Sequence, residues 1–282
     1  FLVHYYSLSF RGNAVEEKSK YSQDFQLNLS IPRICHPQNF SDLCSKVRFM
    51  KKADFIFIAA VVVFFMPFFT CSYVFDSYIN FNAEHGMVMS FIKFAILATL
   101  GEVIGLRIRT GTYYQKGFGV LPRAIVWGFL GLTIKLAFVI FAVGTPAFLA
   151  YLGMENAPIL MKQAFSFDKL LVAFSISAAM NLIYAPVMMT LHKITDMHIL
   201  KNGGTLAGFF RPIQFGQHFV NLDWKVQWNF VFKKTIPFFW IPAHTITFLL
   251  PPDFQVLFAA ILGIALGMIL AVAGMKKSID NN

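Results

Sequence analysis

Residues 231–274 read VFKKTIPFFWIPAHTITFLLPPDFQVLFAAILGIALGMILAVAG. Two apolar runs flank a Pro-Pro-Asp corner at 251–253, and lysine pairs stand outside them at 233–234 and 276–277. Each run is long enough to cross a hydrocarbon core of ~30 Å at ~1.5 Å per helical residue. Because cytoplasmic loops are rich in Lys and Arg, the pattern predicts a transmembrane helical hairpin with both ends cytoplasmic.

The composition of the whole chain agrees with a membrane environment. Of 282 residues, 57% are hydrophobic, 34 are Phe and only 13% are charged, against about 25% charged in soluble domains. The net charge of +10 would suggest nucleic acid in a soluble protein. Here the basic residues stand beside apolar runs, so we expect a lipid bilayer as partner and no nucleic acid. The three cysteines (Cys35, Cys44 and Cys71) have no metal-site or disulfide spacing.

Apolar segments recur along the chain from residue 53 onward. We predict an all-α integral membrane protein of about six transmembrane helices, with both termini cytoplasmic. Its links are alternately basic and acidic or neutral, as the positive-inside rule requires. The predicted spans lie near 53–75, 87–106, 124–152, 170–191, 232–251 and 254–274.

The remaining segments lie at the start of the chain and after the fourth span. Residues 1–49 are mixed and polar, and Met50-Lys51-Lys52 resembles a protein start, so 1–49 is interpreted as an extension or disordered tail before a single membrane domain at 50–282. The loop 192–231 holds Trp224 and Trp228 four residues apart. This spacing fits an interfacial helix in the headgroup layer, and equally a connector whose indoles pack on helix ends.

Polar side chains inside the apolar segments are the best functional candidates, because they are costly in hydrocarbon. Glu102 and Lys135 fall in consecutive spans and could form a buried pair, two separate charges, or the lining of a polar path. Prolines near the other candidates would free backbone carbonyls that water or neighbours must satisfy. The candidate lining residues are Glu102, Lys135, Asn181, Tyr184 and His244.

Two further patterns concern helix packing and metal binding. Small residues four apart let helices approach closely, and the candidates are Gly101, Gly105, Gly263 and Gly267. They fit packing within the monomer, or a homo-oligomer. His192, Asp196 and His198 could bind a metal, but with no second ligand cluster we expect no metal and no cofactor.

The last quarter of the chain resembles the Mpv-seventeen and twenty-two-kilodalton peroxisomal membrane protein family. Its signature is an upstream Trp, an aromatic-Trp-Pro entry, a Phe and a Pro corner. Gly101-Glu102 and Arg123 with Gly131 are similar to earlier family positions, whereas Gln255 replaces a basic residue. The residues that fill this signature, with Ile241 inserted between the Trp and the Pro, are Trp224, Trp240, Pro242, Phe248 and Pro251.

The resemblance implies a small polytopic membrane protein proposed to form channels for small solutes. We therefore expect a non-enzymatic channel or solute pathway, in a bacterial inner membrane or, in a eukaryote, a mitochondrial or peroxisomal one. A structural or assembly factor without transport activity is the first alternative. A membrane metalloenzyme is the second.

Overall fold

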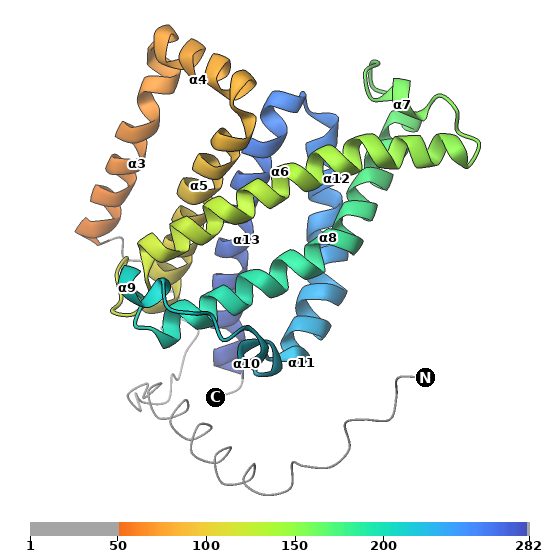
Figure 1. Ribbon diagram of the computed structural model, residues 1–282. Helices are drawn as coiled ribbons and strands as arrows, with labels where there is room; N and C mark the ends of the chain where they lie inside the picture. Colours follow the sequence, from red (N-terminus) through yellow and green to blue (C-terminus); the bar gives the residue numbers. More distant parts are fainter. Residues whose placement is uncertain (1–50, 281–282) are drawn as a thin grey trace, which may run out of the picture. The chain divides into compact units, whose positions relative to one another are not determined.

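The computed structural model describes residues 51–280, with side chains as far as Met268, and these residues form helices and no strand (Figure 1). The predicted tail at 1–49 lies outside them. They fall into two units that divide within the first helix, at Ala60. The helices are α3 Lys52–Thr70, α4 Ser72–Glu84, α5 Gly86–Thr110, α6 Val120–Tyr151, α7 Ala157–Leu160, α8 Phe167–Lys201, α9 Leu206–Phe209, α10 Phe215–Val220, α11 Trp224–Val226, the π-helix η1 Gln227–Trp240, α12 Ile241–Leu249 and α13 Pro252–Asp280.

Local sequence explains where the long helices begin and end. α5 ends at Gly111, whose φ of 76° suits glycine and whose N–H donates to the Arg107 carbonyl. α8 begins after Ser166, whose side chain accepts a hydrogen bond from the Lys169 N–H. The turn before α13 follows from Pro251, since proline lacks the N–H that would continue α12.

Five helices of the second unit make its core. α5 packs against α6 and α13, and α8 packs against α6 and α12 (Figure 1). The largest core side chain is Phe248 of α12, which lies against Phe138 of α6 at 5.1 Å between ring centroids. The core therefore joins segments from both halves of the chain.

The distribution of polar and apolar side chains is that of a membrane protein. Large apolar residues such as Phe129, Val143 and Ile183 are more than half exposed, while Ser177 and Thr247 are fully buried. Among the described residues, four helices are long and apolar enough to cross a membrane: α3, α5, α6 and α8. The apolar part of α13, Pro252–Met268, is shorter. These findings support an all-helical membrane protein.

Several predicted boundaries differ from the structure. The first span, 53–75, breaks at Cys71, between α3 and α4. The fourth span does not end at 191, because α8 continues to Lys201. The apolar pattern stops at the polar HKITDMH segment, but this polar face still packs against other helices, so the helix persists.

The predicted fifth span, 232–251, is one continuous helical path with two geometries. Its first part, η1, carries Pro237 and closes with a hydrogen bond from the Ile241 N–H to the Ile236 carbonyl, five residues back. The second part, α12, is an ordinary α-helix. Pro237 has no N–H to donate, so it interrupts the regular backbone hydrogen bonding at this point of the path.

Candidate functional site

A buried ion cluster joins the ends of three helices. Arg123, three residues into α6, donates from Nη1 to Glu102 Oε2 of α5 and to Asp196 Oδ1 of α8, each at 2.5 Å. The side chains of Arg123, Glu102 and Asp196 are only 7%, 19% and 15% exposed. One guanidinium thus bridges two carboxylates from helices far apart in sequence.

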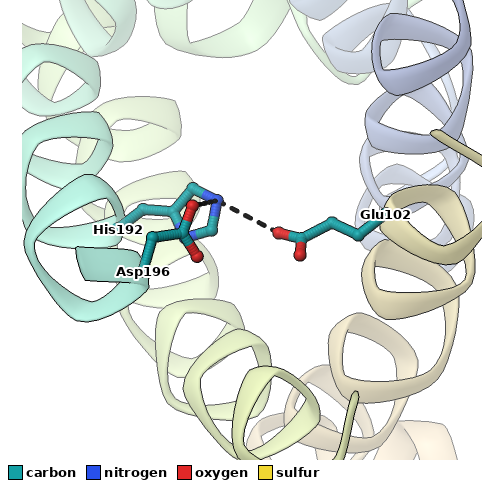
Figure 2. A group of neighbouring side chains, drawn as sticks. All are labelled: Glu102, His192 and Asp196. Carbon is teal, nitrogen blue, oxygen red and sulfur yellow. Dashed lines mark ion pairs between the residues drawn. The ribbon is translucent and has the colours of Figure 1, made fainter. Parts of the chain in front are cut away.

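His192 completes the cluster one helical turn before Asp196. Figure 2 shows both side chains projecting from α8 toward Glu102 of α5. The His192 Nε2 lies 3.3 Å from Glu102 Oε1 and 3.9 Å from Asp196 Oδ2. Trp127 of α6 donates from Nε1 to Glu102 Oε1 at 2.8 Å, and its ring lies 4.4 Å from the His192 ring. Every carboxylate oxygen named here faces a donor or the imidazole.

The backbone around Arg123 holds its side chain in place. Its Nε donates to the Phe118 carbonyl at 2.8 Å, and its guanidinium lies 4.5 Å from the centre of the Phe118 ring. Gly119, with φ of 71°, precedes α6, and a Cβ there would lie 2.9 Å from the Gly204 Cα. The loop before α6 and the loop after α8 therefore meet closely, which brings the two helix ends together.

The charges of the cluster nearly balance. Two carboxylates face one arginine, which stays protonated, so a proton on His192 would bring the sum to zero. Buried charges persist only when they are paired and hydrogen-bonded. His192 Nδ1 is buried and has no hydrogen-bond partner among the described residues. A proton on Nδ1 would therefore balance the charge of the cluster without making a hydrogen bond within the described part of the chain.

Glu102, His192 and Asp196 also have ligand atoms within 4.8 Å of one another, as a metal site would. A divalent ion there would share both carboxylates with Arg123, and its charge would repel the guanidinium. The donor set thus suits the arginine better than a metal.

His198, the third member of the predicted metal group, lies outside the cluster. Its Nε2 bonds the Phe209 carbonyl at 3.0 Å, and its Nδ1 is 3.2 Å from the Asn202 amide nitrogen. Both ring nitrogens are therefore used within the fold. The neighbouring His218 is buried on α10, and burial, together with Lys201 and His198, lowers the pKa of His218.

The structure separates Glu102 from Lys135. A Cβ on Gly86, the first residue of α5, would lie 3.8 Å from Lys135 Cε. Glu102 is sixteen residues further along α5 (102 − 86), or about 24 Å at ~1.5 Å per residue. Lys135 instead lines a cavity of about 360 Å³ between α4, α5, α6 and α13.

The other predicted lining residues form hydrogen bonds between helices. Asn181 of α8 and His244 of α12 lie 3.0 Å apart, and Trp240 stacks on the His244 ring at 5.0 Å. Tyr184 pairs with Thr133 of α6 at 2.7 Å. These contacts cross-link α8 to α12 and to α6.

Three of the four predicted packing glycines form one seam between α5 and α13. A Cβ on Gly101 would lie 2.9 Å from the Ile264 Cα, one on Gly105 would lie 3.7 Å from the Gly267 carbonyl oxygen, and one on Gly267 would lie 3.3 Å from the Gly101 carbonyl oxygen. Gly263 does not take part, since a Cβ there would meet nothing within 4 Å. The four-residue spacing on α13 put both glycines on one face, but only the second reaches α5.

The residues that carry the family resemblance are spread along α11, η1, α12 and the corner. Trp224 bonds from Nε1 to the Phe219 carbonyl, Trp240 Nε1 is buried without a partner among the described residues, and Phe248 is in the core. Pro242 is the second residue of α12, and Pro251 follows the end of this helix.

Trp127 and Lys93 were not predicted as site residues from the sequence. Arg123 was predicted only as a charge in a loop and as a position of the family resemblance. Lys93 stands within the apolar run FIKFAIL, and a charge inside such a run is itself a signal. Trp127 offered no comparable signal, because tryptophan is ordinary in a membrane helix.

Comparison with known proteins adds no relative: no family model, no curated protein and no solved structure matches this chain. The function therefore has to be argued from the fold and the site.

Proposed function

We propose that the protein is a polytopic membrane protein that provides a pathway for small solutes. The observation that carries the proposal is the cavity beside Lys135, because ionisable residues inside a membrane bundle usually mark a solute or ion path. Its volume of about 360 Å³ falls in the range of small-molecule sites. The protein needs no catalytic group for this role.

The ion cluster supplies the closed end of the proposed pathway. Glu102 lies sixteen residues along α5 from Gly86, which lines the cavity, and there Arg123 joins Glu102 to Asp196. Their contacts hold the three helices together. Opening would separate these contacts, and a proton gained or lost at His192 would alter their balance.

The proposal includes six crossings with both termini in the cytoplasm. The path from Gln227 to Leu249 is helical and long enough for the fifth crossing, and α13 continues to Asp280 for the sixth. The lysines at 233–234 and the arginines at 107 and 109 mark the cytoplasmic side. A bacterial inner membrane and kinship with the family named above fit this arrangement.

Filling the cavity tests the pathway directly. Gly86 lines it in an ordinary helical conformation, so Gly86→Trp places an indole in the space without backbone strain. In liposomes holding purified protein, we expect uptake of radiolabelled acetate, glycerol or rubidium above that of empty vesicles, and at least a fivefold loss in Gly86→Trp.

Gly144→Trp is the matched control, because a Cβ at Gly144 meets nothing within 4 Å. It should leave uptake unchanged. Equal uptake by the two variants, or no uptake by the unaltered protein, would remove the pathway.

A structural or assembly role is the second candidate, favoured by the Gly101–Gly267 seam and the satisfied ion cluster. If this role is correct, the protein should be stable and show no uptake in the same assay. Larger side chains at the glycines of the seam should then abolish its complex with a partner.

A further inference from the structure

Two lysines meet beside the cavity. Lys93 of α5 is 5% exposed, and its Nζ donates to Asn82 Oδ1 at 2.5 Å and lies 5.1 Å from the centre of the Tyr78 ring. Lys135 of α6 lines the cavity together with Asn82 and has no hydrogen bond or ion pair within the part of the chain that the structure describes. An ammonium without a counter-charge is costly among packed helices, so a negative charge beside Lys135 would stabilise it.

Two long helices also begin at this cavity. Gly86 opens the 25-residue α5 and Pro252 opens the 29-residue α13, and both residues line the space. The first N–H groups of a helix have no partner within it, and they carry about half a positive charge. The residue before α5, His85, offers no side-chain cap. The N-terminus of α5 therefore favours a negative charge in the cavity, whereas at α13 Pro252 has no N–H and the Phe254 N–H already donates to the Pro251 carbonyl.

The carboxylate that lines the cavity is Asp253, in the first turn of α13. Lys93 is attracted to Asp253 and repelled by Lys135, so the three groups act on one another. Two ammonium groups against one carboxylate leave one positive charge. The polar hydroxyl of Tyr78 is buried without a partner among the described residues.

We propose that this cavity binds an anion, a carboxylate or phosphate group held between Lys135, the α5 N-terminus and the Asn82–Lys93 pair. The role of this anion in transport rests on the proposed solute pathway. The anion is either the transported solute or is bound together with it. The inference of a binding site rests on the charge of Lys135 and on the N-terminus of α5. A free anion and an anionic lipid headgroup share this chemistry.

Titration calorimetry on the full chain in neutral-lipid nanodiscs tests the site with acetate and inorganic phosphate as probes. We expect saturable binding that Lys135→Gln weakens by about tenfold or more, the effect of one charge-assisted contact. Asp253→Asn removes the competing carboxylate and should tighten binding. A merely structural role would not move the two variants in opposite directions.

Lys162→Gln is the control, because Lys162 is an exposed lysine outside the cavity. Should soluble anions fail to bind, mass spectrometry of copurified lipid decides the source: anionic phosphatidylglycerol retained by the unaltered protein and lost in Lys135→Gln supports a headgroup. If neither acetate, phosphate nor phosphatidylglycerol depends on Lys135, the anion site is wrong.

The two proposals fail separately. Anion binding without uptake in liposomes would refute the pathway and leave the site. Uptake that Gly86→Trp blocks but Lys135→Gln and anions leave unchanged would refute the site and leave the pathway.

Discussion

Arg123 shows how one side chain can hold three helices. It bridges Glu102 and Asp196, and its Nε is fixed by the Phe118 carbonyl. Removing one partner from such a buried network costs about 3–5 kcal/mol, because a charge is left uncompensated. Removing a carboxylate and the arginine together costs less, since the balance of charge is kept.

The seam glycines give a prediction at the same scale. Gly101→Leu would place a side chain against the Ile264 backbone, so we expect a loss of about 1–3 kcal/mol in the free energy of unfolding. Gly263→Leu meets nothing within 4 Å and should cost nothing. Thermal unfolding in detergent measures both, and equal losses would contradict the seam described above.

The sequence allowed unusual residue types to be predicted as site residues, but not the partners of these residues. A charge within an apolar run marked Glu102 and Lys135 as unusual, and both prove to be in polar surroundings. The partners were not predictable, because Glu102 meets Arg123 and His192, which lie 21 and 90 positions further along the chain (123 − 102 and 192 − 102). Such contacts depend on how the helices cross, which apolar periodicity does not specify.

At the scale of elements, long apolar runs predicted α5 and α6 well, since hydrophobicity and length decide them. The polar end of α8 and the π-helical geometry of η1 were beyond such reasoning. Tertiary contacts extend α8 through His192 and Asp196, and Pro237 alters the hydrogen bonding of η1.

Labelling of single cysteines tests whether η1 and α12 together make a crossing. In a protein whose native cysteines are replaced by serine, Lys225→Cys and Pro251→Cys should react with a membrane-impermeant maleimide from opposite sides. Lys162→Cys, in the loop before α8, should react on the same side as Pro251→Cys. Labelling of positions 225 and 251 from one side would mean that this segment does not cross.

At the scale of the second unit, polar groups gather at two places. The cavity lies where α5 and α13 begin, and the ion cluster lies toward the other end of α5. Between them the core is mostly apolar, apart from hydrogen-bonded groups such as Asn181 and His244. A pathway through this unit would therefore be closed at rest by the core and the cluster together.

Solute uptake by the charge-balanced variant Glu102→Gln/Arg123→Gln tests whether the ion cluster closes a solute pathway through the protein. It removes one carboxylate and one guanidinium, leaving His192 with Asp196, so the net charge of the cluster is unchanged. If the cluster closes a solute pathway, liposomes with this variant should take up labelled solute several times faster than those with the unaltered protein. Uptake equal to that of empty vesicles for both proteins would contradict the account.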